Sequence, residues 1–172
     1  MKLAARELVS LSLIAAITLA AKEVMSFLPN IEPVTLFLMC TALVYGWKAL
    51  YPCYVFVLLE GLLYGFGWWF YCYLYIWGIL VAVVVLLKRF DLSWTAWTIV
   101  AALFGLCFGT LCCLQSLIVG GWQLAFSFFV AGIPYDLLHC AGNAVICGVL
   151  LKPLTTRLQK LAQPDTSIPE KE

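Results

Sequence analysis

The chain has 172 residues, of which 65% are apolar and only 11% are charged. A soluble globular domain normally carries about 25% charged residues, so this composition excludes an ordinary water-soluble fold. The formal net charge of +1 indicates nothing about partners, because in a membrane the position of each charge matters more than the sum. We therefore expect an all-α membrane protein that crosses the bilayer several times.

The first half of the chain predicts four membrane spans. The first apolar run covers residues 8–27 and is followed by LPNIEP, whose two prolines forbid a continuous helix. Residues 34–87 then remain almost entirely apolar, which at about 18 residues per crossing gives room for three helices. Glycines and polar residues place the two turns between them near residues 46–48 and 65–69.

The second half predicts two more spans. A polar loop at residues 88–91 precedes an apolar run over residues 94–119. Gly120 and Gly121 then predict a turn, and residues 134–151 predict the sixth span, which opens at a proline. The expected fold is a bundle of six transmembrane helices.

The basic residues support this count and give an orientation. Six spans place the basic residues that precede the final tail on one side of the membrane. Lys22, at the end of the first run, is the one exception. By the positive-inside rule that side is cytoplasmic, so both termini are expected there. We expect residues 1–160 to form the transmembrane domain and residues 161–172 a disordered cytoplasmic tail. The residues on the shared side are Lys2, Arg6, Lys48, Lys88, Arg89, Lys152, Arg157 and Lys160.

Polar residues interrupt two of the apolar spans. Asp136, His139 and Asn143 stand at i, i+3 and i+7, which places them on one face of the sixth helix. A sixth helix that starts at residue 134 puts them about 3, 8 and 14 Å below its outer end, and Glu60 of the third helix lies about 9 Å below the same surface. Because ionisable groups are costly at membrane depth, each is a candidate functional residue. We predict that these side chains line a pocket that opens outward.

Aromatic residues are dense around the same outer surface. The stretch YGFGWWFYCYLYIW covers residues 64–77, Trp122 follows the next outer turn, and PNIEP adds two polar side chains from the first outer loop. Rings with a few polar groups suit a flat, partly polar organic molecule. The predicted substrate-binding residues are Asn30, Glu32, Glu60, Tyr64, Trp68, Trp69, Tyr71, Tyr75, Trp122, Asp136, His139 and Asn143.

These features also have structural alternatives. Tyr and Trp form interfacial belts in most membrane proteins. Asp136 and His139 could pair with each other or with the N-terminus of their own helix, and Glu60 could lock two helices together by a hydrogen bond. The eight cysteines all lie in apolar runs without a CxxC spacing, so we expect no metal site and no catalytic role for them.

Small residues form a further pattern. Ser12, Ala16 and Ala20 follow at intervals of four and make a flat strip along the first helix. Such strips let membrane helices approach closely, so this one could be an external docking face for another membrane subunit. Two GxxxG patterns, which we expect to serve internal packing, are Gly61/Gly65 and Gly105/Gly109.

The sequence resembles the substrate-binding S components of energy-coupling factor (ECF) vitamin transporters. The resemblance is carried by AITLA at residues 16–20, by PNIEPVTLF after it, by VLLEGLLYGFG in the third helix and by GIPYDLLHCAGN in the sixth. It covers nearly the whole chain apart from the tail.

The resemblance implies a protein of the bacterial inner (plasma) membrane that binds a vitamin or related micronutrient from outside. It implies a pocket made by the outer loops and helices four to six, and docking through Ala16 and Ala20 onto a transmembrane coupling subunit driven by two cytoplasmic ATPases. It also implies that the subunit topples in the membrane to deliver its cargo. Neither a cofactor, nor catalysis by this chain, nor a nucleic-acid partner is expected.

The choice of ligand and of function leaves alternatives open. Carboxylates near stacking surfaces favour a heteroaromatic ligand with N–H or hydroxyl donors, including cationic ones, over a polyanion. One alternative function is an intramembrane enzyme in which Asp136 and His139 act as a general acid/base pair. The other is a structural or assembly protein whose polar groups only hold helices together.

Overall fold

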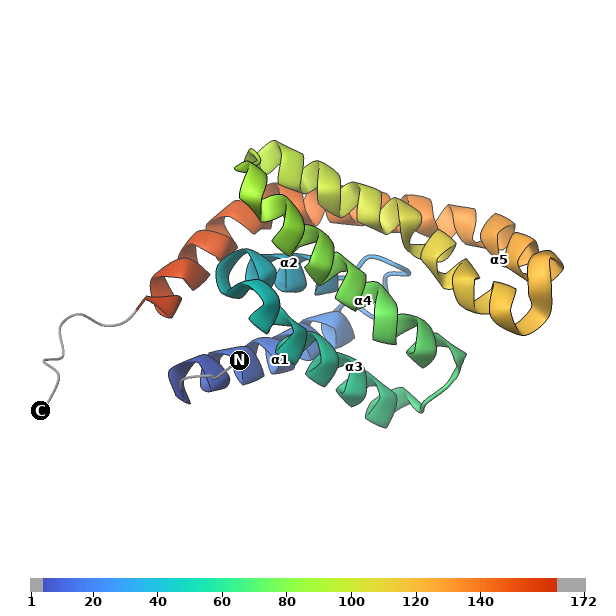
Figure 1. Ribbon diagram of the computed structural model, residues 1–172, viewed down its shortest axis with the longest axis horizontal. Helices are drawn as coiled ribbons and strands as arrows, with labels where there is room; N and C mark the ends of the chain where they lie inside the picture. Colours follow the sequence, from blue (N-terminus) through green and yellow to red (C-terminus); the bar gives the residue numbers. More distant parts are fainter. Residues whose placement is uncertain (1–4, 164–172) are drawn as a thin grey trace, which may run out of the picture.

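The computed structural model describes residues 5–163, and all regular structure in this range is helical (Figure 1). This confirms the all-α class. The predicted tail begins too early, because the last helix continues through residues 161 and 162; residues 164–172 lie outside the described range, as does Lys2. The elements are α1 (Ala5–Val24), α2 (Val34–Tyr45), η1 (Gly46–Ala49), α3 (Leu50–Tyr64), α4 (Trp68–Leu87), η2 (Lys88–Phe90) and α5 (Trp94–Ala162).

Two glycines end helices at the turns that the sequence predicts. Gly46 has a φ of 60° directly after α2, and Gly65 has a φ of 82° directly after α3. Glycine adopts these left-handed conformations without the steric cost that a Cβ would impose. Both predicted turns within residues 34–87 are therefore confirmed.

A third glycine divides α5 into two arms. Gly121 has a φ of 69° and a ψ of −168°, which breaks the helical path between residues 94–120 and residues 122–162. The chain reverses there, and the second arm runs back beside the first (Figure 1). The turn predicted at Gly120 and Gly121 is confirmed.

The sixth helical segment begins earlier than the sequence predicts. The second arm of α5 is helical from residue 122, and Pro134 lies inside it, so the predicted start at residue 134 is wrong. Membrane helices tolerate an internal proline because neighbouring groups satisfy the backbone carbonyl that the proline leaves free. At 1.5 Å per residue, Asp136 lies about 21 Å along this arm instead of close to its end.

Three helical stretches in residues 5–163 are long and apolar enough to cross a membrane. They are Val34–Tyr64, Trp68–Phe90 and Trp94–Ala162, and the first and last of these contain two helical segments each. Their length and composition indicate a multi-pass membrane protein. The helix α1 adds 20 residues with Glu7 in its first turn and Lys22 in its last.

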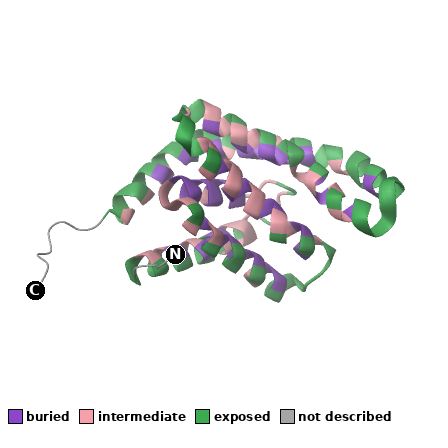
Figure 2. Ribbon diagram, in the orientation of Figure 1, coloured by how far each residue is buried: buried purple, intermediate pink, exposed green. Residues whose placement is uncertain are grey.

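The centre of the molecule lies around α2. Nine of its 12 residues are buried, and it packs mainly against α5 and α4, whereas α1 packs against α3. Figure 2 shows buried ribbon concentrated on the inner faces of these helices and exposed ribbon at the turn between the arms of α5. The polar residues considered next lie between the helices that surround this centre.

Candidate functional site

The polar residues of the second arm of α5 face the first arm. Asp136, His139 and Asn143 are each at most 6% exposed. The Asp136 carboxylate accepts a hydrogen bond from the backbone N–H of Gly109 at 2.8 Å, and the Asn143 amide donates one to the carbonyl of Ala101 at 3.0 Å. The three side chains thus share one face, as their spacing predicts, and two of them tie the arms together.

Glycines in the first arm make room for these contacts. A Cβ at Gly105 would lie 2.8 Å from the backbone carbonyl oxygen of His139, and a Cβ at Gly109 would lie 2.6 Å from a carboxylate oxygen of Asp136. Real Cβ atoms do not approach so closely, so any larger residue would push the arms apart. The GxxxG pattern of the first arm serves internal packing, as expected.

His139 belongs to an aromatic cluster between α4 and α5. Its ring centroid lies 5.0 Å from that of Phe108 and 6.5 Å from that of Phe104, and Trp77 of α4 packs against the same two phenylalanines. Within residues 5–163, neither Nε2 of His139 nor Nε1 of Trp77 has a hydrogen-bond partner, although both atoms are buried. Buried polar atoms of this kind normally bind a water or a ligand.

A second polar group lies where α1 and α3 end. The ammonium of Lys22 is 2.7 Å from Oε2 of Glu60 and 3.7 Å from Oε1 of Glu23. The Tyr64 hydroxyl donates a hydrogen bond to Glu23, and the Lys22 ammonium lies 5.2 Å from the centre of the Tyr64 ring. Glu60 is 2% exposed, so this ion pair is held at the edge of the apolar interior.

The loop between α1 and α2 connects the two polar groups. Burial raises the pKa of Glu32 to about 7; Lys22 opposes this rise and Glu60 adds to it. The preceding residue, Ile31, packs against Gly142 in the second arm of α5, where an added Cβ would lie 3.3 Å from its side chain. This loop therefore lies close both to the ion pair and to the arm that carries His139. We call Glu23, Glu32 and Glu60 the acidic cluster.

The predicted aromatic residues divide between the interior and the surface. Trp69 packs edge-to-face against Tyr73, with 5.3 Å between ring centroids, and the Tyr75 hydroxyl donates a 2.8 Å hydrogen bond to the carbonyl of Leu111. Tyr73 lies within electrostatic range of Glu32 and Glu60. The predicted residues that are exposed are Asn30, Tyr64, Trp68, Tyr71 and Trp122.

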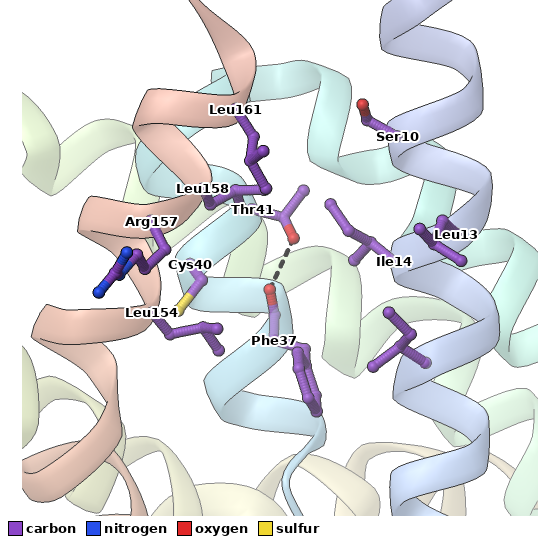
Figure 3. A pocket seen from close by; sticks show the side chains of 11 residues that line it. Ser10, Leu13, Ile14, Phe37, Cys40, Thr41, Leu154, Arg157, Leu158 and Leu161 are labelled. Atoms are coloured by element: carbon purple, nitrogen blue, oxygen red, sulfur yellow. Dashed lines mark hydrogen bonds between the residues drawn. The ribbon is translucent and has the colours of Figure 1, made fainter.

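The structure gives Glu60 and Asp136 different partners. Glu60 binds Lys22 of α1, whereas Asp136 binds the first arm of α5. Four grooves and cavities among residues 5–163 are lined by other side chains. One of about 210 Å³ lies between α1, α2 and the last turns of α5; Figure 3 shows Phe37 and Leu158 on its walls. The substrate pocket around the predicted residues therefore stays a prediction.

Two residues of this site were missed by sequence reasoning. Lys22 was interpreted as an exception to the charge pattern and was not assigned to the site, and Glu23 was not considered. The available signal was the position of Lys22. It lies at the outer end of the first span, on the side of the membrane opposite the other basic residues. A lysine at that depth requires a carboxylate partner, and Glu60 lies at a matching depth in the third span.

Comparisons of this chain with protein-family models, with curated proteins and with solved structures find no match. The class that the fold and these residues define is an all-helical, multi-pass membrane protein. Within residues 5–163 it has a buried ion pair and several buried polar atoms without a hydrogen-bond partner.

Proposed function

We propose that this protein is the substrate-capture subunit of an ECF-type importer in the bacterial plasma membrane. It binds a vitamin or a related small heteroaromatic micronutrient from outside, and a coupling subunit powered by two separate ATPases drives delivery. The observation that carries the proposal is the Lys22–Glu60 ion pair, buried together with Glu32 in an otherwise apolar protein. Charges at this depth are costly, and function is the usual reason for keeping them.

In this proposal six helical segments cross the membrane: α1, α2, α3, α4 and the two arms of α5. Both termini then lie in the cytoplasm, and the turn at Gly121 lies outside together with the loops at residues 25–33 and 65–67. The acidic cluster falls at the outer ends of α1 and α3 and beneath the first outer loop. A site in that position is accessible to a micronutrient arriving from outside.

We propose different roles for the predicted site residues on the basis of their contacts. Asp136 and Asn143 satisfy their hydrogen bonds on backbone groups of the neighbouring arm, so they position that arm. Nε2 of His139 has no hydrogen-bond partner within residues 5–163, and we propose that His139, Glu32 and Glu60 contact the substrate, with Trp69 and Tyr73 as stacking surfaces. An Asp136–His139 acid/base pair receives no support from these contacts.

The small-residue strip of α1 supports the partner that we propose. Ser12, Ala16 and Ala20 are exposed, whereas Leu11 and Ala15 on the same helix are buried in the molecule. A strip of small side chains on the outside of a membrane helix permits close approach by another helix. We assign it to the coupling subunit.

Two measurements test the function. Mass spectrometry of the purified, denatured protein should identify one retained small molecule, and that molecule should quench tryptophan fluorescence when it is added back. Co-expression with a coupling subunit and its ATPases should yield a complex that Ala16→Leu weakens at least tenfold. Val149→Leu, at a 67% exposed position on α5, is the matched control. A protein that retains no small molecule and forms no complex would contradict the proposal.

A further inference from the structure

Two apolar grooves meet at one arginine near the end of α5. The first, of about 210 Å³, lies between α1, α2 and α5 (Figure 3), and the second, of about 350 Å³, lies between α2 and α5. Three residues line both grooves, namely Phe37, Leu154 and Arg157. The two grooves are therefore adjacent and share a single positive charge.

The polar side chains in the first groove are already hydrogen-bonded within the protein. The hydroxyl groups of Ser10 and Thr41 donate to backbone carbonyls one turn earlier on their own helices, at 2.9 Å and 2.6 Å. The thiol of Cys40 donates to a backbone carbonyl of α5 at 3.9 Å. Since these groups are satisfied, the walls of the groove suit a hydrocarbon chain better than a polar molecule.

The first groove extends along the helices that line it. Its lining residues run from Ser10 to Ile17 on α1 and from Leu154 to Leu161 on α5, which is about 10 Å along each helix axis. One leaflet contributes about 15 Å of hydrocarbon, half of the roughly 30 Å core of a bilayer. The groove therefore has the length to cover most of one acyl chain.

The basic side chains at this end of the molecule have no acidic partners. Arg157 is exposed, and Lys160 follows it one turn later on α5. The guanidinium of Arg6 donates a 3.0 Å hydrogen bond to the carbonyl of Leu161, which lines the first groove. Within residues 5–163 none of these three basic groups forms an ion pair. Figure 3 shows the Arg157 guanidinium on the side of α5 that faces away from α1.

We propose that the two grooves bind one anionic phospholipid, such as a phosphatidylglycerol, with one acyl chain in each groove and its phosphate on Arg157. A guanidinium binds two phosphate oxygens at once, and basic pockets between membrane helices bind anionic head groups. A zwitterionic lipid has the same chains, but its ammonium group offsets the phosphate charge. The inference goes beyond the proposed function and does not depend on its substrate. No residue of the small-residue strip on α1 lines either groove, so the lipid and the coupling subunit occupy different surfaces.

The test uses the full-length protein in detergent and two probes with the same acyl chains, dioleoyl phosphatidylglycerol and dioleoyl phosphatidylcholine. Native mass spectrometry should show one phosphatidylglycerol bound at least tenfold more tightly than phosphatidylcholine. Arg157→Gln should weaken phosphatidylglycerol binding at least fivefold and leave phosphatidylcholine binding unchanged. Arg89→Gln is the matched control, because the Arg89 guanidinium lies 4.8 Å from the centre of the Phe90 ring and lines neither groove.

A second pair of variants tests the acyl-chain part of the site. Leu13 is 58% exposed and lines the first groove, so Leu13→Trp should fill it and weaken phosphatidylglycerol binding at least threefold. Leu8→Trp is its control, at a 54% exposed position on the same helix that lines neither groove.

Equal binding of the two lipids, equal effects of the two arginine variants, or equal effects of the two tryptophan variants would overturn the lipid site. A different result would also overturn it: Arg157→Gln could abolish assembly with the coupling subunit while phosphatidylglycerol binds at full affinity. The grooves would then hold a protein partner instead of a lipid.

Discussion

The carboxylate of Asp136 and the backbone N–H of Gly109 lie 2.8 Å apart and join the two arms of α5. A Cβ at position 109 would lie 2.6 Å from the other carboxylate oxygen, so the hydrogen bond and the glycine require each other. This contact fixes the distance between the arms and, with it, the position of the His139 ring against Phe108.

Gly109→Ala should therefore lower the free energy of unfolding by about 1–3 kcal/mol, because the new methyl group displaces the Asp136 carboxylate. Gly132→Ala in the second arm is the control, since nothing lies within 4 Å of an added Cβ there. That substitution should be neutral or stabilising by up to about 1 kcal/mol. Thermal unfolding in detergent measures both variants, and equal midpoints for the two would contradict the packing argument.

Asn143 makes the second polar contact between the arms. Asn143→Leu removes the donor to the carbonyl of Ala101 and should cost about 0.6–2 kcal/mol, the range measured for hydrogen bonds between membrane helices. Val145→Leu, at a 67% exposed position two residues away, should change the unfolding midpoint little. If both substitutions have the same small effect, the Asn143 hydrogen bond does not stabilise the hairpin.

The buried Lys22–Glu60 pair predicts a characteristic result in a double-mutant cycle. Lys22→Met leaves the Glu60 carboxylate buried without its counter-charge and should cost about 3–5 kcal/mol of unfolding free energy. The double variant Lys22→Met/Glu60→Gln should recover most of that loss, because the buried charge of Glu60 is removed together with its partner.

The control cycle uses the pair Lys48–Glu7, whose side chains are 24% and 30% exposed. Solvent screens that pair, so Lys48→Met should cost only about 0–1 kcal/mol. Equal losses from Lys22→Met and Lys48→Met would mean that Lys22 and Glu60 are hydrated in the folded protein and form no buried pair.

The turns could be predicted from the sequence because glycine has a local effect. Gly46, Gly65 and Gly121 each adopt a backbone conformation that side chains disfavour, and each ends a helix where the apolar runs require a turn. The start of the sixth segment could not be predicted in the same way. Pro134 reads as a helix start in water, but inside a membrane helix the surrounding packing satisfies the groups that it frees.

The sequence predicted only part of the polar site, because helical periodicity does not identify which helices are neighbours. Spacing of three and four residues places Asp136, His139 and Asn143 on one face of a helix, but it does not identify the neighbour that this face contacts. The neighbour is the preceding arm, and the partner of Glu60 is Lys22, which the sequence pattern connects only with the orientation of the chain in the membrane. Helical periodicity determines which face of a helix a residue occupies, whereas the contacts of that face depend on how the helices pack.

Glu32 predicts a pH dependence of stability. Burial, together with the nearby Glu60, raises its pKa from an ordinary 4.5 to about 7 in the folded protein, and Lys22 limits the rise. The folded state thus holds the proton more tightly than the unfolded state, so the Glu32 contribution to stability is fully present below about pH 4.5 and is lost as the pH rises to about 7. Glu32→Gln should remove this part of the slope in thermal midpoints measured from pH 4.5 to 8, whereas Glu7→Gln should retain it.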